Sequence, residues 1–235
     1  MIDKFVKYLS IYKRKLQYKK ISYSLNAVDL VIDYIFKNQI TGTYVDVGAQ
    51  HPISNNNTYL LHKRGWRGIN IDLDKKNIDL FNTSRPKDIN LNYAISDKET
   101  EVDLFFYHDA SPINTLSKKV SSYYKAKIKD VRKIKTYTLN TVMQKVDFTD
   151  TIDYLNIDVE GFENEVLGGF DLKKYKPKVI SIEFLDLEMN KLEFKNNNLL
   201  NVTKSDLYKT LINNDYFFIN WLHGDLIFTH KDFRD

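Results

Sequence analysis

Short apolar segments that alternate with stretches of helical character constrain this fold more than any other feature of the sequence. Residues 43–47, 66–72 and 89–96 each have the length and apolar pattern of a strand. Residues 57–63 and 75–83, which lie between them, have helical character. Alternation of this kind predicts a parallel sheet with right-handed crossover connections, and therefore an α/β protein.

The C-terminal half of the sequence extends the same sheet. Residues 153–158 and 179–184 are predicted to be a fourth and a fifth core strand. Residues 216–222 and 226–230 are two further strands, and the turn residues between them predict a hairpin. We therefore expect a mostly parallel, seven-stranded sheet with an antiparallel C-terminal hairpin.

The distribution of these elements suggests two regions. Residues 1–40 are expected to be a helical, basic extension, and residues 41–235 the main domain. Within the main domain, residues 109–131 are polar and interrupt the strand pattern after a further strand at 102–107. We expect this stretch to be an insertion that covers the site.

The first twenty residues carry an uneven charge, with seven Lys or Arg residues and one acid, Asp3. Apolar residues recur among them at helical spacing, at Phe5, Leu9, Tyr12 and Leu16. Two interpretations are open: a basic amphipathic helix that contacts an anionic membrane surface, and a terminal helix with a solvated Lys face. The second is more usual for a run of charges, so peripheral membrane contact is the secondary expectation.

The absence of cysteine excludes several kinds of site. With no Cys in 235 residues, the chain has no disulfide, no thiolate metal site and no catalytic thiol. The N-terminal residues lack the apolar core of a secretory signal, and the sequence holds no run of about 18 to 20 apolar residues. A cytoplasmic protein is the expectation.

The loop after the first strand contains a single glycine, Gly48, two residues after Asp46. A dinucleotide-binding turn needs G-x-G-x-x-G to bring its backbone amides against a pyrophosphate, and this loop lacks that pattern. One tight turn preceded by an acid instead suits a ligand that has an ammonium group and no phosphate.

Two further strand ends carry polar residues. Asp72 ends the second strand, where a carboxylate can accept hydrogen bonds from both hydroxyls of an adenosine ribose. The third strand ends at Ser96, where a backbone amide and a short polar side chain can pair with an adenine edge. Ligands of α/β proteins bind at the carboxyl ends of strands, so these residues favour an S-adenosylmethionine pocket over a nicotinamide pocket.

Seven segments between residues 42 and 186 follow one another in a characteristic order: DVGAQHP, GWRGINID, NYAISD, INTL, TYTLNT, DYLNIDVEGFENEVLGGF and KVISIEF. In this order they resemble the FkbM-type methyltransferases, which use S-adenosylmethionine to O-methylate sugars and related hydroxylated compounds. The resemblance implies a Rossmann-like class I methyltransferase sandwich and a role in polysaccharide biosynthesis. It also implies a sugar, nucleotide-sugar or glycan acceptor.

The resemblance further implies where the cofactor binds, with Asp158 near the transferred methyl group. Where the family commonly has Asn followed by a further Gly, this chain has Gln-His-Pro at 50–52. Asn57 and Thr58 are therefore both left open as partners of the methionine carboxylate. The expected cofactor-binding residues are Asp46, Gly48, Ala49, Thr58, Asp72, Leu73, Ser96 and Asp158.

Methyl transfer to a hydroxyl needs a base, and four residues are candidates. Asp158 and Glu160 lie two residues apart at a strand end and can face one cleft, although both could instead cap the following helix. Glu183 would be a costly buried charge unless it is paired or faces the cleft. Histidine titrates near neutral pH, which makes His51 the fourth candidate, although a loop His before a Pro is often only a surface residue.

The sequence is also compatible with a bound metal ion and with two functions other than sugar O-methylation. Asp158, Glu160 and Glu183 would supply the oxygen ligands that Mg²⁺ prefers, but a metal-free site is favoured. A non-catalytic module of a glycan-assembly complex is disfavoured because the acids at 46, 72 and 158 are all present. A nucleic-acid methyltransferase is disfavoured because no Asn/Asp-Pro-Pro element follows the fourth strand. The favoured prediction is an O-methyltransferase that acts on a sugar or polysaccharide precursor.

Overall fold

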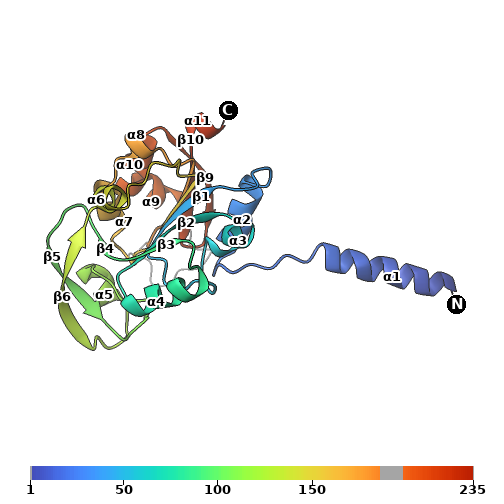
Figure 1. Ribbon diagram of the computed structural model, residues 1–235, viewed down its shortest axis with the longest axis horizontal. Coiled ribbons are helices and arrows are strands. Elements are labelled where there is room, and N and C mark those ends of the chain that lie inside the picture. Colours follow the sequence, from blue (N-terminus) through green and yellow to red (C-terminus); the bar gives the residue numbers. More distant parts are fainter. Residues whose placement is uncertain (1, 186–197, 235) are drawn as a thin grey trace.

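The computed structural model describes residues 2–185 and 198–234, and these residues form a central seven-stranded sheet (Figure 1). In their order across the sheet, the strands are β3 (Ile89–Asn92), β2 (Arg67–Asp72), β1 (Thr43–Val47), β7 (Tyr154–Ile157), β8 (Val179–Glu183), β10 (Asp225–His230) and β9 (Tyr216–Leu222). Neighbouring strands from β3 to β8 pair in parallel, whereas β10 runs antiparallel to both β8 and β9. The predicted mostly parallel sheet with an antiparallel C-terminal hairpin is confirmed.

The strand order reverses at the centre of this sheet. The chain runs outward from β1 to β2 and β3, and it returns to β7 on the other side of β1. The carboxyl ends of β1 and β7 therefore flank the position where an open α/β sheet binds its ligand.

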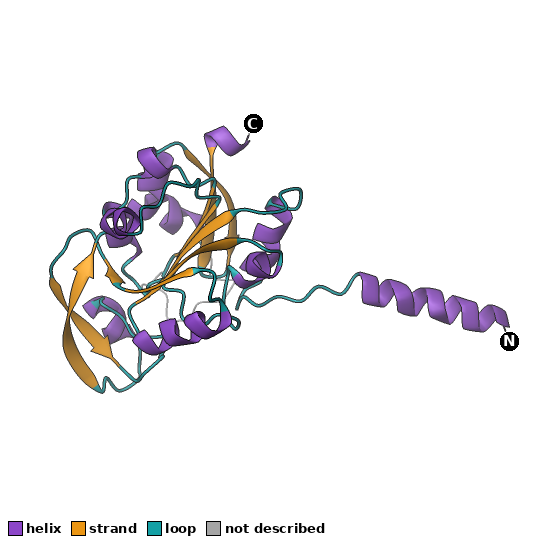
Figure 2. Cartoon of the chain, in the orientation of Figure 1, coloured by secondary structure: helices purple, strands orange, loops and turns teal. Residues whose placement is uncertain are grey.

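Helices cover both faces of the sheet, and two hydrophobic clusters fill the space beneath them (Figure 2). These helices are α2 (Val28–Ile35), α3 (Tyr59–Lys63), α4 (Lys75–Ser84), α6 (Leu139–Lys145), α7 (Glu163–Gly168), α8 (Leu172–Tyr175), α9 (Leu199–Lys204), α10 (Asp206–Ile212) and α11 (Lys231–Arg234). Successive residues of β1 point to opposite faces of the sheet. Tyr44 joins the cluster formed with α2 and α3, whereas Val45 and Val47 join the cluster formed with α6 to α10.

A second, three-stranded sheet lies beside the main one, and it shows that the predicted strand over residues 89–96 is wrong. The sequence predicts a single strand over residues 89–96, but the strand breaks at Tyr93, and the chain continues as β4 (Ala94–Ile95), which pairs with β6 (Asp130–Tyr137). Strand β6 also pairs antiparallel with β5 (Glu101–Phe106). Apolar alternation continues across the break, so the pattern alone does not reveal that the hydrogen-bonding partner changes there.

The segment predicted as an insertion, residues 109–131, contains α5 (Lys118–Tyr123) and the first residues of β6. It is tied to the loop that follows β7, because the Thr115 hydroxyl donates a hydrogen bond to the carbonyl oxygen of Glu160 (2.6 Å). The segment thereby reaches the carboxyl edge of the main sheet.

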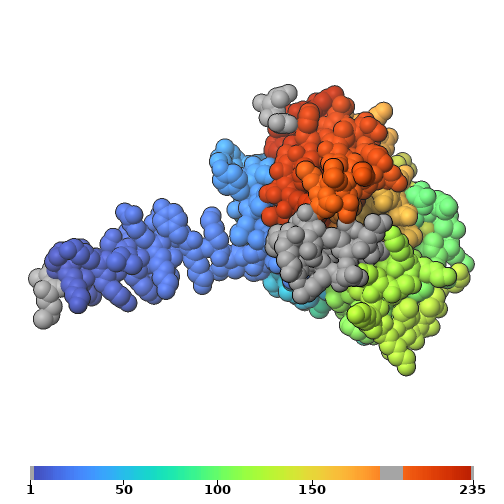
Figure 3. All heavy atoms as spheres, turned by 180° about the vertical axis from the view of Figure 1, so that it is seen from behind, coloured from blue at the N-terminus to red at the C-terminus, as the bar shows by residue number. Residues whose placement is uncertain are grey.

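Helix α1 (Ile2–Gln17) projects away from the body of the molecule (Figures 1 and 3). Residues 3–20 are all exposed, so the apolar residues of α1 are as accessible as its Lys and Arg side chains. Among the described residues, no helix has the length and apolar character needed to span a bilayer.

Candidate active site

A cleft with an empty volume of about 570 Å³ lies at the carboxyl ends of β1 and β2, and we refer to it as the β1–β2 cleft. Asp72 and Leu73 line it from β2, Gly48 from the loop after β1, and Asp158 from the loop after β7. The structure therefore brings four predicted cofactor-binding residues together in one cleft.

Asp72 is held in place by its neighbours on two segments. Its carboxylate accepts hydrogen bonds from the backbone N–H groups of Gln50 (2.8 Å) and Asp74 (2.7 Å) and from the side chain of Asn77 (3.1 Å). Burial raises the pKa of Asp72 to about 6, although these donors oppose the rise. A carboxylate has about four acceptor positions, so these three donors leave capacity for a ligand hydroxyl.

The close approach of the loops after β1 and β7 explains why residue 48 is glycine. Gly48 has a φ of +82°, and a Cβ atom on it would lie 1.7 Å from the carbonyl oxygen of Asp158. The N–H groups of Gly48 and Ala49 both donate to the carbonyl of Ile71 (2.9 and 3.0 Å). Ala49 is buried behind this contact and is not one of the described residues that line the cleft.

Asp46 and Thr58 belong to a buried polar network behind the cleft. The Asp46 carboxylate accepts hydrogen bonds from the side chains of Asn56 (3.2 Å), Thr58 (2.8 Å) and Asn156 (2.9 Å). Burial raises the pKa of Asp46, while these donors lower it. The structure thus uses Asp46 to fix the loop after β1, and the contact of Asp46 with an ammonium group stays a prediction.

Arg85 holds the same loop and was not predicted from the sequence. Its guanidinium is fully buried and donates hydrogen bonds to the Pro52 carbonyl, to Asn56 Oδ1 (2.7 Å) and to Thr58 Oγ1 (2.9 Å). In the sequence, Arg85 is recognisable only as the residue before a proline at the end of a helix. Its role depends on a loop some thirty residues earlier in the chain, and no local pattern indicates such a contact.

Ser96 lies just beyond the cleft. Its N–H donates to the Tyr137 carbonyl (2.9 Å), and its hydroxyl donates to the carboxylate of Asp97 (3.1 Å). The described residues that line the cleft from this segment are Tyr93, Ala94 and Ile95, so the lining ends just before Ser96. A contact of Ser96 with an adenine edge stays a prediction.

His51 lies in a turn that is separate from the acids. Its Nδ1 accepts hydrogen bonds from the backbone N–H groups of Ile53 (3.1 Å) and Ser54 (3.0 Å). In the part of the chain that the structure describes, His51 lines neither of the two cavities of the site. The structure does not bring His51 to the other catalytic candidates, and its role as a base stays a prediction.

A second cavity adjoins the β1–β2 cleft and has an empty volume of about 1020 Å³. The two share part of their walls at Gly48, Asp158 and Glu160. Asn57, one of the two residues left open for the methionine carboxylate, lines this second cavity. We call it the acidic cavity because its described lining holds four carboxylates and no Lys or Arg; these acids are Asp158, Glu160, Glu183 and Asp225.

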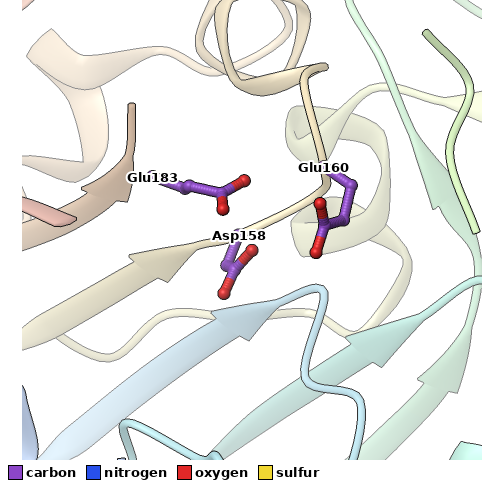
Figure 4. A group of neighbouring side chains, drawn as sticks. All are labelled: Asp158, Glu160 and Glu183. Atoms are coloured by element: carbon purple, nitrogen blue, oxygen red, sulfur yellow. The ribbon is translucent and has the colours of Figure 1, made fainter. Parts of the chain in front are cut away.

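Asp158, Glu160 and Glu183 converge in the acidic cavity (Figure 4). One oxygen atom from each carboxylate lies within 4.8 Å of the other two. Strands β7 and β8 are adjacent and parallel, so Asp158 and Glu183 leave the sheet side by side. Burial raises the pKa of both residues well above the usual range, and the neighbouring acids raise it further. Three of the four predicted catalytic residues thus meet at one point.

The loop after β7 turns Glu160 back toward this cluster. Glu160 and Gly161 have φ values of +57° and +92°, and Tyr124 donates a hydrogen bond to the Glu160 carboxylate. Burial raises the pKa of Glu160 to about 7. The N–H groups of Val159 and Gly161 donate to the Glu163 carboxylate (3.1 and 3.0 Å), so Glu163 fixes the loop before α7. The helix itself begins after Phe162 without a side-chain cap, so the structure does not show the capping role that the sequence left open for Asp158 and Glu160.

Sequence reasoning did not identify Asp225 as a site residue, because its position in a turn between two strands explained it fully. Asp225 begins β10 and pairs with Glu183 across the antiparallel ladder, which places its side chain at the acidic cavity. Burial raises the pKa of Asp225 to about 6. The antiparallel pairing of the hairpin with the fifth strand is the signal that could have located it.

The fold and the site together define a class of protein. A seven-stranded sheet with this strand order, and with a cleft at the carboxyl ends of its central strands, is the architecture of a class I methyltransferase. The chain belongs to the FkbM methyltransferases: the family described as "Methyltransferase FkbM domain" matches residues 46–216. Methyltransferases of this kind use an S-adenosylmethionine-type cofactor. A comparison with curated proteins gives no match.

Proposed function

We propose that the protein is an S-adenosylmethionine-dependent O-methyltransferase that acts on a hydroxyl of a sugar or polysaccharide precursor. The observation that carries this proposal is the shared wall of the β1–β2 cleft and the acidic cavity at Gly48, Asp158 and Glu160. The first space is lined by the predicted cofactor-binding residues, and the second is larger and is lined by four acids. A donor in one can therefore meet a hydroxyl in the other.

The lining of the β1–β2 cleft fits the adenosine part of the cofactor. It combines the Asp72 carboxylate with the apolar side chains of Leu73 and Ile95 and the amides of Asn77 and Asn114. A planar base favours apolar walls with a few polar groups, and ribose hydroxyls donate to a carboxylate. In this proposal Asp72 holds the ribose, and Leu73 and Ile95 flank the base. The bound cofactor supplies a methyl group attached to a positively charged sulfonium.

The acids at the shared wall supply the base. Asp158 and Glu160 line both cavities, so each reaches the boundary between donor and acceptor. An ionised carboxylate at either position would accept the hydroxyl proton while the hydroxyl oxygen bonds to the methyl carbon and the carbon–sulfur bond of the donor breaks, which would leave the donor as a neutral thioether. Tyr124 orients Glu160 by a hydrogen bond. Orientation of the two reactants and removal of this proton are the main tasks of the protein in such a transfer.

The acids of the acidic cavity favour an uncharged acceptor as long as the cavity holds no cation. Four acids line it, and those that are ionised would repel a phosphate group that entered it. This argues against a nucleic-acid acceptor and against a nucleotide-sugar that inserts its diphosphate. The convergence of Asp158, Glu160 and Glu183 also argues against a non-catalytic module, because nothing in such a module requires three acids so close together. A neutral, hydroxyl-rich glycan is the acceptor class that we propose.

Calorimetry with S-adenosylhomocysteine tests the cofactor site. We expect micromolar binding by the wild-type protein and a loss of about 1 to 3 kcal/mol in Asp72→Ala, because at least one hydrogen bond to a charged group is removed. Asp79→Ala is the matched control, since Asp79 is an exposed acid on α4 that pairs with Lys75. Equal affinity of the wild type and Asp72→Ala would refute the assignment of the cleft.

Turnover with a panel of neutral glycans tests the chemistry. Asp158→Asn is expected to lower the yield of methylated product at least about 100-fold, the usual contribution of a positioned base. Its affinity for S-adenosylhomocysteine should stay close to that of the wild type, because Asp158 is not the predicted ribose ligand. His51→Ala is the comparison variant and should retain turnover. Undiminished turnover in Asp158→Asn would remove Asp158 from the mechanism.

A further inference from the structure

We propose that Asp158, Glu160 and Glu183 bind a divalent cation of the oxygen-preferring kind, such as Mg²⁺ or Ca²⁺, in the acidic cavity. The site is argued from the geometry of these three residues. Only its use, which is to hold the hydroxyls of the acceptor beside the shared wall, rests on the proposed function. The sequence favoured a metal-free site, so the arrangement of the side chains changes that expectation.

The spacing of the three carboxylates fits one ion. Their nearest ligand oxygens lie within 4.8 Å of one another. Ligand oxygens that share one ion are at most about 4.2 Å apart around Mg²⁺ and about 4.8 Å apart around Ca²⁺, since the metal–oxygen distances are about 2.1 and 2.4 Å. The three carboxylates are therefore close enough to share one ion after small side-chain movements that bring their oxygens closer together. Carboxylates that merely share a solvated surface need no such convergence.

The Glu183 carboxylate provides a second and independent observation. Its Oε2 atom is buried, and it has no hydrogen-bond partner among the described residues. Figure 4 shows this side chain directed toward Asp158 and Glu160. A buried carboxylate oxygen without a donor carries a large desolvation cost, and a bound cation removes that cost.

The described residues around the cluster give it no ion pair, although His223 also lines the cavity and opposes the rise in the pKa of Asp225 that burial causes. In residues 2–185 and 198–234, no Lys, Arg or His forms an ion pair with Asp158, Glu160 or Glu183, and the donor to Glu160 is the neutral hydroxyl of Tyr124. Asp225 adds a fourth acid to the same cavity. Buried charges are normally paired or coordinate a metal. The same cavity also has the room that an ion needs to keep water or hydroxyl ligands.

A cation at this place would have a direct use in the proposed reaction. Mg²⁺ and Ca²⁺ bind neutral oxygens as well as carboxylates, so vicinal hydroxyls of a sugar can complete the coordination. The ion would hold the acceptor against the wall shared with the β1–β2 cleft and would promote loss of the hydroxyl proton. It would also offset the mutual repulsion of the acids that line the cavity.

The test is calorimetric titration of the full chain with Mg²⁺, Ca²⁺ and Mn²⁺, with electron paramagnetic resonance of bound Mn²⁺ as a second readout. We expect one ion per chain with a Kd between about 10⁻⁵ and 10⁻³ M for at least one of them. Glu183→Gln and Asp158→Asn should each weaken binding at least about tenfold. Glu101→Gln, which changes an exposed acid on β5, is the matched control and should bind as the wild type does.

Two outcomes would overturn the proposal. One is the absence of binding by the wild-type protein up to about 10 mM of each ion, well above the weakest affinities of protein calcium sites. The other is equal binding by the wild type, Glu183→Gln and Asp158→Asn. Binding of S-adenosylhomocysteine is measured on the same samples without metal. If it persists while the ion fails to bind, the metal site is refuted and the proposed function is not.

Discussion

Asp72 is the residue whose protonation should be coupled most directly to cofactor binding. Its pKa is raised to about 6 because the carboxylate is buried and the acid Asp74 lies beside it, while the N–H of Gln50 and the side chain of Asn77 oppose the rise. Above this pH the residue is ionised and is a strong acceptor for a ribose hydroxyl. Below it the group is protonated and loses most of that strength.

We therefore expect the affinity for S-adenosylhomocysteine to be constant above about pH 7 and to decrease as the pH falls through about 6. Asp72→Asn cannot ionise, so its weaker binding should be nearly independent of pH over the same range. Calorimetry between about pH 5 and 8 on both proteins checks this. A wild-type affinity that does not change across the range would contradict the role given to Asp72.

The sequence could locate individual acids because each follows a predicted strand. Asp72, Asp158 and Glu183 lie at the ends of strands whose carboxyl ends share one edge of a parallel sheet, so their convergence follows from the strand order. The partners of Asp46 could not be found in this way. Asn156 reaches Asp46 from the neighbouring strand β7, and Arg85 reaches the loop after β1 from the end of α4; no local pattern records either contact.

At the scale of elements, the junction of β1 and β7 requires glycine at position 48 for two separable reasons. Gly48 has a left-handed φ of +82°, and its Cα lies so close to the loop after β7 that a Cβ would overlap the Asp158 carbonyl. Gly65 has a similar φ of +99°, but the space around its added Cβ is open. The two positions therefore separate the cost of backbone conformation from the cost of the steric clash.

Gly65→Ala is expected to lower the free energy of unfolding by about 1 to 2 kcal/mol, the cost of a left-handed conformation for a residue with a Cβ. Gly48→Ala should cost about 3 kcal/mol or more, because overpacking against backbone adds to that strain. Urea unfolding of both variants and the wild type measures the difference. Equal losses would show that the loops after β1 and β7 separate easily, which would weaken the description of the shared wall.

Elements with a clear hydrophobic pattern and marked ends were predicted well. Elements whose bounds depend on the strand they pair with were not. Strand β1 has the predicted bounds, because a buried strand followed by glycine is marked at both ends. The strand predicted over 89–96 divides between two sheets, since alternation does not specify the neighbouring strand. Helices α9 and α10 were not predicted: both are short, and both lie farther along the chain from the preceding predicted strand than the similarly short α3 does.

At the scale of the whole molecule, the site depends on segments that are distant in sequence. The acidic cavity takes residues from the loops after β1 and β7, from the segment 109–131 and from the hairpin of β9 and β10. The alternation of strands and helices predicted the fold because it is repeated along the chain. The size and the acidity of the cavity could not be predicted, because they depend on how these loops pack against one another.

The molecule consists of a packed body and an exposed arm, α1, and the arm leads to the last prediction. Its residues Phe5, Leu9, Tyr12 and Leu16 are between 47% and 62% exposed. They lie at helical spacing on a helix that also carries five Lys or Arg residues, so an anionic membrane surface complements both the apolar and the basic side chains. The packing of the body does not involve the arm, because residues 3–20 are exposed along their whole length.

Removal of residues 1–20 should therefore change the free energy of unfolding by no more than about 0.5 kcal/mol and leave S-adenosylhomocysteine binding unaltered. The full chain is expected to co-sediment with vesicles that contain phosphatidylglycerol, and much less with pure phosphatidylcholine, with binding that weakens as salt screens the charges. Leu9→Asp should reduce binding because it places a charge among the apolar side chains, whereas Ser10→Asn is the control at the neighbouring position. If the full chain and the truncated chain sediment alike, the arm does not contact membranes and has a solvated face only.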